Sequence, residues 1–154
     1  MTLTALRVHW QRKEQGILRI AITGATGMIG SRLTAFLLAQ GHQITVISRS
    51  KSHPPQTSVI LWDPELNYMG GGQLEGFDVI IHLAGANVGE YWTPRHKQDI
   101  LESRVQSTKL LCESLLRTAS RPKLLISASA IGFYGNHPPE KVLDENSRIL
   151  NKGI

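Results

Sequence analysis

The stretch "RIAITGATGMIG", Arg19–Gly30, decides the fold of this chain, because an apolar, β-branched run passes directly into a glycine-rich turn. Three glycines follow the run at a spacing of three: Gly24, Gly27 and Gly30. Residues 28–42, "MIGSRLTAFLLAQGH", then carry apolar side chains at helical spacing as far as Gly41, a residue typical of the position after a helix. The stretch therefore predicts a strand, a tight turn and a helix.

Further apolar runs predict more strands, alternating with helical segments. The expected strands span residues 17–23, 43–50, 58–62, 77–85 and 123–130. A long helical pattern runs from about Pro94 to about Thr118, whereas residues 63–76 are rich in turn-forming residues. Nearly continuous apolar strands are typical of parallel sheets that helices cover on both faces. We therefore predict an α/β fold with a doubly wound parallel sheet, the Rossmann fold.

The length of 154 residues is sufficient for one domain but not for two. We assign residues 17–154 to the sheet domain. Residues 1–16 lie outside the alternating pattern and form an N-terminal extension, which is a disordered arm, an over-long start of the sequence or a short helix. Because sheets of this kind ordinarily continue past a fifth strand, we expect a domain that is truncated at its C-terminal end. The strand at 123–130 would then be a bare edge.

Composition excludes several classes of function. The net charge of +5 favours a small anionic ligand over nucleic acid, because Lys and Arg are scattered among acidic residues rather than clustered with aromatic ones. No apolar stretch is long enough to cross a bilayer, and charged residues stand where a signal peptide has its apolar core. We therefore expect a cytoplasmic protein without membrane partners. The single cysteine, Cys112, cannot form an internal disulfide, and no His/Cys cluster has metal-binding spacing.

The glycine turn predicts a phosphate site, because the first N–H groups of a helix have no partner within it and carry partial positive charge. Gly24 would allow the tight turn, Gly27 the close approach of a pyrophosphate, and Gly30 the packing of the helix on the sheet. Dinucleotide binding is our interpretation, and a purely structural turn is the alternative. The predicted contact residues, in which Thr26 adds a hydroxyl donor, are Gly24, Thr26, Gly27, Met28, Ile29 and Gly30.

The second predicted strand ends at Ser48 and Arg49, where dinucleotide-binding sheets contact the adenosine ribose. An acidic residue there accepts hydrogen bonds from the ribose hydroxyls of NAD, whereas a guanidinium pairs with the additional phosphate of NADP. We therefore predict NADP as the cofactor, with a solvated loop arginine as the alternative. Small residues at the end of the 77–85 strand would let the cofactor lie against the backbone: Leu83, Ala84 and Gly85.

The motifs "TGATGMIG", "LAG", "SRVQST" and "SASAIGFYG", in this order, resemble the extended short-chain dehydrogenase/reductases. The segments "VISRS", "ILWDPE" and "WTPRHKQDILESRVQST" are similar to an atypical branch, the NAD-dependent epimerase/dehydratase-like proteins, and the likeness covers Leu18 to the C-terminus. The resemblance implies the NADP-binding domain of an oxidoreductase or epimerase-like enzyme, without its substrate domain. It also implies that Asp99 and Arg104 face the cofactor, although charges on a solvated helix face are the alternative.

Catalysis is not established by these motifs. Hydride transfer at a carbon that bears oxygen needs a proton relay, which the superfamily builds from a tyrosine, a lysine four residues later and a nearby hydroxyl. No Tyr-x-x-x-Lys occurs in this chain. Aligned on Tyr134, the relay hydroxyl falls on Ala130, so the adjacent Ser129 is the candidate catalytic residue, with a strand-end serine bonded to backbone as the alternative. A non-catalytic NADP-sensing module is the second hypothesis; the small-molecule substrate is undefined, and a homodimer is left open.

Overall fold

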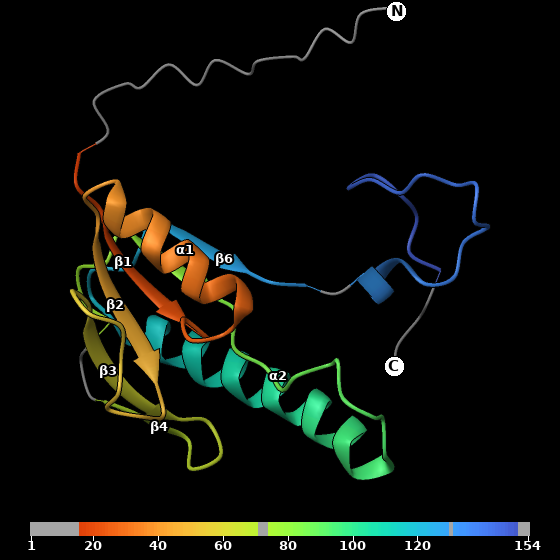
Figure 1. Ribbon diagram of the computed structural model, residues 1–154, viewed down its shortest axis with the longest axis horizontal. Helices are drawn as coiled ribbons and strands as arrows, with labels where there is room; N and C mark the ends of the chain where they lie inside the picture. The colour runs from red at the N-terminus through yellow and green to blue at the C-terminus, as the bar shows by residue number, and fades with distance from the viewer. Residues whose placement is uncertain (1–15, 71–73, 130, 151–154) are drawn as a thin grey trace, which may run out of the picture.

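The computed structural model describes residues 16–70, 74–129 and 131–150, so the predicted extension before Gly16 lies outside the described residues. Neither of the two longer helices in this part of the chain is long and apolar enough to cross a membrane. The elements in chain order are β1 (Arg19–Thr23), α1 (Met28–Ala39), β2 (Gln43–Ser48), β3 (Ser58–Asp63), β4 (Tyr68–Met69), β5 (Val79–His82), α2 (Pro94–Leu116), β6 (Leu124–Ser127) and the short 3-10 helix η1 (Ile131–Tyr134) (Figure 1).

Within the described residues, six strands form one sheet in the order β4-β3-β2-β1-β5-β6. β1 pairs in parallel with both β2 and β5, while β2 continues to β3 and β5 continues to β6, also in parallel. β4 runs antiparallel to β3. The strand order thus moves away from β1 in one direction and from β5 in the other. In sheets of this kind, ligands bind at the carboxyl ends of the strands between which the order reverses. In this sheet those strands are β1 and β5.

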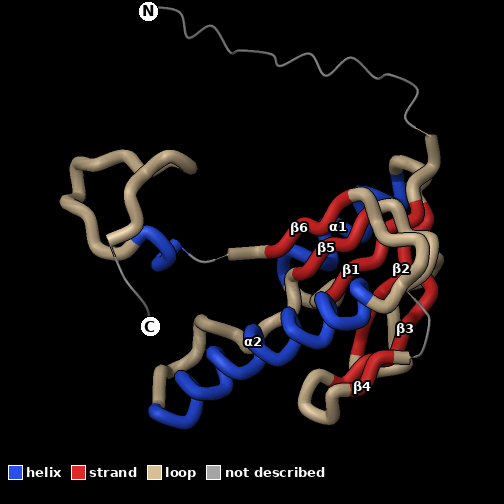
Figure 2. The backbone as a smooth tube through the Cα atoms, turned by 180° about the vertical axis from the view of Figure 1, so that it is seen from behind, coloured by secondary structure: helices blue, strands red, loops and turns tan. Residues whose placement is uncertain are grey.

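The two helices cover opposite faces of the sheet, as Figures 1 and 2 show from opposite sides. Successive strand residues point to opposite faces, so the apolar runs of β1 and β2 fill two separate clusters. On one face, strand residues such as Val46 pack against residues of α1: Leu33, Leu37 and Leu38. On the other face, the neighbouring Ile47 belongs to a cluster with residues of α2: Leu110, Leu111 and Leu115. The predicted α/β fold with a doubly wound parallel sheet is confirmed, with the short antiparallel strand β4 added at one edge.

Local signals in the sequence located the helix ends well. Both helices begin at the predicted residues, Met28 and Pro94. Gly41 follows α1 with a φ of +86°, the left-handed conformation that glycine adopts after a helix. The start of α2 has a further signal, since the hydroxyl of Thr93 accepts a hydrogen bond of 3.1 Å from the N–H of His96.

The two edges of the sheet differ from each other. At one edge, residues predicted only as turns include the two-residue strand β4, whose hairpin is closed by the Gly70 N–H on the Leu61 carbonyl at 3.0 Å. That prediction was incomplete, because two residues give no periodic pattern. At the other edge, all four residues of β6 are exposed. This agrees with the bare edge expected for the last strand.

Candidate functional site

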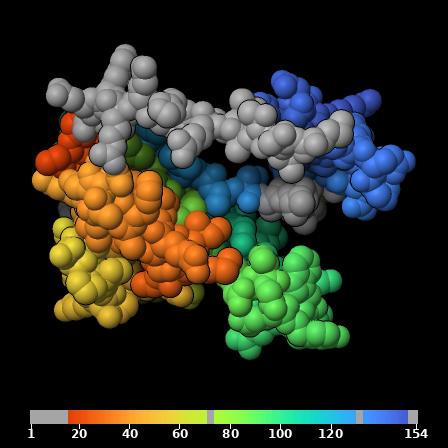
Figure 3. Space-filling model, turned by 45° about the horizontal axis from the view of Figure 1, so that its top comes forward, coloured from red at the N-terminus to blue at the C-terminus, as the bar shows by residue number. Residues whose placement is uncertain are grey.

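A cleft of about 1080 Å³ opens at the carboxyl ends of β1, β2 and β5. Segments far apart in the sequence form its walls: the glycine turn, residues 46–50, the β3–β4 loop, residues 83–86 and the N-terminal half of α2. Figure 3 shows this hollow between the orange atoms around the glycine turn and the green atoms of the segment that leads into α2. Small-molecule sites typically measure about 300–1,000 Å³, so the cleft is large enough for a dinucleotide.

The glycine turn is packed too tightly for side chains at two positions. Gly24 has a φ of +69°, and a Cβ added to it would lie 2.8 Å from the carbonyl carbon of Leu83. A Cβ added to Gly30 would lie 2.8 Å from the Cα of Ala25 and closer still to the Gly24 carbonyl oxygen. Helix α1 therefore starts directly against the turn, and the turn lies directly against the end of β5.

Helix α1 presents its N-terminus to this cleft. Gly27 is its N-cap and lines the cleft, and no described side chain caps the helix. The Gly27 N–H donates to the Gly24 carbonyl at 3.1 Å. The next three N–H groups have no acceptor within an α-helix, and the first turn contains no acidic residue. This end of α1 can therefore hold an anionic group such as a phosphate.

A buried polar network fixes the turn to the neighbouring strand. Thr23 and His82 are register partners in β1 and β5, and 2.7 Å separates Thr23 Oγ1 from His82 Nδ1. The hydroxyl oxygen of Thr23 accepts hydrogen bonds from the N–H groups of Leu83 and Ala84, both at 3.1 Å. The hydroxyl hydrogen of Thr23 is therefore directed to His82 Nδ1. His82 Nε2 then carries the ring proton and donates it to Thr108 Oγ1 at 3.1 Å. One neutral histidine thus joins β1, β5 and α2 beneath the cleft.

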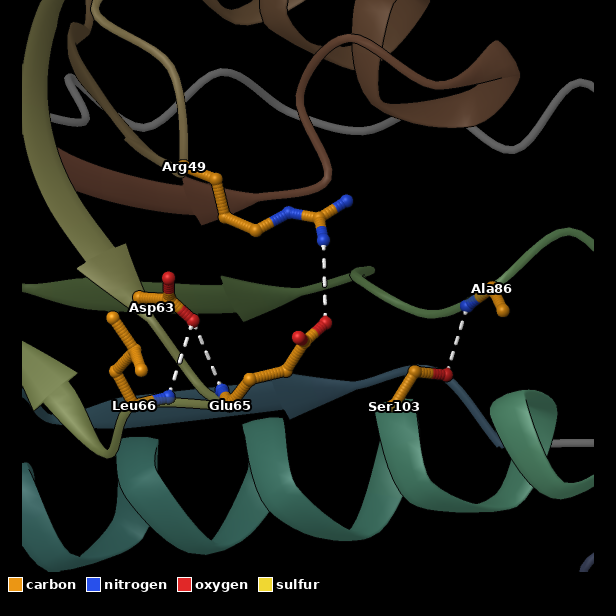
Figure 4. A network of polar contacts seen from close by, with 6 residues as sticks. All are labelled: Arg49, Asp63, Glu65, Leu66, Ala86 and Ser103. Atoms are coloured by element: carbon orange, nitrogen blue, oxygen red, sulfur yellow. Dashed lines mark hydrogen bonds and ion pairs between the residues drawn. The ribbon is translucent and has the colours of Figure 1, made fainter.

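Two loops face each other at the β2 side of the cleft (Figure 4). Arg49 Nη1, after β2, lies 3.7 Å from Oε1 of Glu65, after β3, and both side chains are largely exposed. The Asp63 carboxylate accepts the N–H groups of Glu65 at 3.0 Å and Leu66 at 3.3 Å, which holds the turn that carries Glu65. This part of the cleft can bind an anion through its guanidinium and a hydroxyl through its carboxylate.

Helix α2 supports the opposite wall. A Cβ added to Gly85 would lie 3.1 Å from Arg104 Cζ, so the guanidinium packs against this backbone. Arg104 Nη1 donates to the Ile100 carbonyl at 3.0 Å within the helix. Ser103 Oγ accepts the N–H of Ala86 at 2.9 Å (Figure 4). These contacts fix the segment after β5 to α2.

A family model matches the part of the chain that contains this cleft. The model describes the NAD dependent epimerase/dehydratase family, and it matches residues 20–151. The chain belongs to this family. Its described residues form the nucleotide-binding Rossmann-type fold of the epimerase/dehydratase family.

Two bacterial relatives illustrate the similarity. The chain is 36% identical over 132 residues to the epimerase family protein YfhF of Bacillus subtilis, which covers 84% of this chain and 43% of that protein. It is 39% identical over 115 residues to the epimerase family protein SH2119 of Staphylococcus haemolyticus, which covers 73% of this chain and 38% of that protein. The chain therefore spans about two fifths of the length of these curated relatives.

Two solved structures, both named as epimerases or epimerase family proteins, are also similar to this chain. Human epimerase family protein SDR39U1 (isoform 2), solved with NADPH, is 30% identical, with a TM-score of 0.69 over 85% of this chain and 42% of that chain. A nucleoside-diphosphate sugar epimerase from Corynebacterium glutamicum is 37% identical, with a TM-score of 0.68 over 86% of this chain and 27% of that chain.

The structure of this epimerase-family chain brings most of the predicted site residues together. Those that line the cleft are Gly24, Thr26, Gly27, Ser48, Arg49, Leu83, Ala84, Gly85 and Asp99. Met28 and Ile29 instead line a second hollow, of about 550 Å³, with Arg32 and Leu33. Gly30 lies behind the turn, and Arg104 lies behind Gly85. Ser129, the predicted catalytic residue, is exposed beyond β6 and is not among the described residues that line the cleft.

Several residues that line the cleft were not predicted from the sequence. On α2 they are Arg95, Glu102, Ser103, Gln106 and Ser107. A signal for them existed, because they stand three, four, seven or eight positions from Asp99 and therefore share its helix face. Glu65 was also missed, although "ILWDPE" was one of the segments that carried the family resemblance. Its place in the cleft depends on where the β3–β4 loop lies relative to β2.

We expect the protonation of His82 to destabilise the fold. Burial lowers the pKa of His82 from its usual 6.5, so the unfolded chain takes up the proton more readily than the folded protein. The contribution of His82 to the free energy of unfolding is therefore fully present above about pH 6.5 and is lost as the pH is lowered below that value. Thermal unfolding measured at about pH 7.5 and about pH 5.5 should show a smaller loss of Tm for His82→Gln than for the wild type.

The control for this experiment is His53→Gln, which removes an exposed histidine before β3. This variant should keep the pH dependence of the wild type. Equal losses of Tm in the wild type and His82→Gln would contradict the prediction.

Proposed function

We propose that this chain is the NADP-binding domain of an oxidoreductase or epimerase-like enzyme. The observation that carries the proposal is that one cleft, at the point where the strand order reverses, holds both an uncapped helix N-terminus and an arginine after β2. The first suits a pyrophosphate and the second suits a ribose phosphate. A dinucleotide with a 2′-phosphate carries both groups on one molecule.

The proposed pyrophosphate site is the start of α1. An added Cβ at Gly24 or Gly30 would overlap neighbouring backbone, so these two positions of the turn accept only glycine. Gly27, at the N-cap, lines the cleft and permits a phosphate to approach the backbone. Thr26 also lines the cleft and supplies a hydroxyl there.

The proposed adenosine end lies at Ser48 and Arg49, and the proposed nicotinamide end lies toward residues 83–85 and α2. The Arg49 guanidinium is exposed at the cleft, where a phosphate can reach its donors. The NADPH named for the human relative adds support for the 2′-phosphorylated cofactor. When bound, the nicotinamide ring supplies hydride transfer, and this chain's residues hold and orient the nucleotide.

Catalytic turnover is a separate part of the proposal and concerns the whole protein. The alternative function is an NADP-sensing module that converts no substrate. Two observations support this alternative. No Tyr-x-x-x-Lys occurs in this chain, and Ser129 stands outside the residues described as lining the cleft. An enzyme of this kind would change the nicotinamide absorbance with a carbonyl or alcohol substrate, whereas a sensing module would only bind.

The experiment that tests the proposal is a titration of the 154-residue chain with NADPH and with NADH, followed by the fluorescence of the reduced nicotinamide. We expect saturable binding of both nucleotides, with tighter binding of NADPH. Absence of binding for both nucleotides would overturn the proposal. Adding candidate carbonyl substrates to the longer protein then separates the enzyme from the sensing module.

A further inference from the structure

We propose that Glu65 is a selectivity-determining residue of the nucleotide site, and that its carboxylate competes with the 2′-phosphate of NADP for Arg49. The inference rests on the proposed function, because that function assigns the ribose phosphate to Arg49. It goes further by giving the chain a built-in group that reduces its preference for NADP over NAD.

The first step is the position of the carboxylate. Glu65 and Arg49 come from different loops and both line the cleft, and their charged groups point toward one another in Figure 4. The distance of 3.7 Å between Arg49 Nη1 and Glu65 Oε1 makes them an ion pair without bound nucleotide. A phosphate that binds the same guanidinium must therefore displace the carboxylate or lie next to it.

The second step is that the turn carrying Glu65 is held in place. Asp63 Oδ1 accepts the backbone N–H groups of both Glu65 and Leu66. The Asn67 N–H donates to the Pro64 carbonyl at 3.3 Å, which closes the turn before β4. Because the pairing of β4 with β3 fixes the far side of this loop, the backbone at Glu65 stays near Arg49. A side chain on a free loop could simply move away when a phosphate arrives.

The third step is the balance of charge for the two nucleotides. With NADP, the carboxylate and the 2′-phosphate would both lie beside one guanidinium, and the two anions repel each other. With NAD, the ribose has a 2′-hydroxyl, which donates a hydrogen bond to a carboxylate without that repulsion. Glu65 therefore opposes NADP and tolerates or favours NAD.

The size of the effect follows from exposure. Arg49 and Glu65 side chains are 73% and 76% exposed, so water and salt screen their interaction. Breaking an exposed pair of this kind changes an equilibrium by about two- to sixfold, and relief of the repulsion adds to this. We therefore expect removal of the carboxylate to tighten NADPH binding about three- to tenfold.

The test compares Glu65→Gln with the wild type by titration with NADPH and with NADH. We expect the dissociation constant for NADPH to fall about three- to tenfold and that for NADH to stay within about twofold or to rise. The matched control is Glu113→Gln, which removes a carboxylate that lies 3.9 Å from Lys109 on α2, among residues that do not line the cleft. It makes the same change in net charge and should leave the ratio of NADPH affinity to NADH affinity unchanged.

A second comparison asks whether the effect acts through Arg49. In an Arg49→Gln background, Glu65→Gln should change NADPH affinity less than it does in the wild type, because no guanidinium is left to release. Glu65→Lys, which reverses the charge, should tighten NADPH binding at least as much as Glu65→Gln. These measurements need no catalytic activity, and thermal unfolding checks that each variant is folded.

The outcomes separate the two proposals. If Glu65→Gln leaves the ratio of NADPH affinity to NADH affinity unchanged, the proposed role of Glu65 is wrong. It is also wrong if Glu113→Gln changes that ratio as much as Glu65→Gln does. If Arg49→Gln still weakens NADPH binding in that case, the proposed function stands. If the wild-type chain binds neither nucleotide, the proposed function fails and this inference fails with it.

Discussion

Arg49→Glu is expected to lower the affinity for NADPH by about tenfold or more, and the affinity for NADH by less. The guanidinium stands at the cleft after β2, where it can make a charge-assisted pair with the 2′-phosphate. The substitution removes that pair and places a second carboxylate beside Glu65, so an incoming phosphate meets two anions and no cation. NADH has no 2′-phosphate and loses only general attraction to the cleft.

Titration with both nucleotides measures this effect, and Lys51→Glu is its control. Lys51 lies in the same exposed loop but is not among the described residues that line the cleft, and its substitution makes the same change in net charge. Lys51→Glu should weaken the binding of NADPH and of NADH slightly and to the same extent. Equal losses of NADPH and NADH affinity in Arg49→Glu would show that Arg49 does not contact the ribose phosphate.

The glycine turn gives the second large effect, because two of its glycines are needed for different reasons. Gly30→Ala should reduce the free energy of unfolding by about 3 kcal/mol, since its methyl group would overlap the backbone of Gly24 and Ala25 and push α1 away from the turn. Gly27→Ala should cost much less stability. Its φ of −74° suits alanine, and the added Cβ would lie 3.3 Å from the Gly24 carbonyl oxygen.

The two variants should therefore separate when NADPH binding is measured beside chemical denaturation. Gly27→Ala should fold and still lose about tenfold or more in NADPH affinity, because the methyl group stands where a pyrophosphate approaches the backbone. Gly41→Ala is the control for a left-handed glycine in open space, since no atom lies within 4 Å of its added Cβ. It should cost about 1 kcal/mol in stability and leave nucleotide affinity unchanged. If Gly27→Ala binds NADPH with the affinity of the wild type, the proposed pyrophosphate site at this turn is wrong.

The fold could be predicted from the sequence because its signals lie between near neighbours in the chain. The β-branched run before Gly24 predicts β1, and Pro94 and Gly41 mark a helix start and a helix end. The two-residue strand β4 could not be predicted in the same way, because its pairing with β3 depends on a loop rather than on a periodic pattern. Short elements at a sheet edge are set by the strand beside them.

The candidate site was predictable where it follows a strand end directly. Parallel strands place their carboxyl ends at one edge of the sheet, so the glycine turn, Arg49 and residues 83–85 meet there as soon as the strand order is known. The role of His82 was not predictable. Its spacing in an apolar strand gives no information about Thr23 or Thr108, which lie on other elements.

The sequence by itself determined the strand–turn–helix unit, the alternation that makes a doubly wound sheet, and the positions of the small residues at the strand ends. These features depend on backbone conformation and on apolar periodicity, which neighbouring residues encode. Only the tertiary structure decided that Glu65 lies beside Arg49 and that Arg104 lies behind Gly85 rather than lining the cleft. Contacts between loops and helices depend on strand order and register, which fix distances between residues that are remote in the chain.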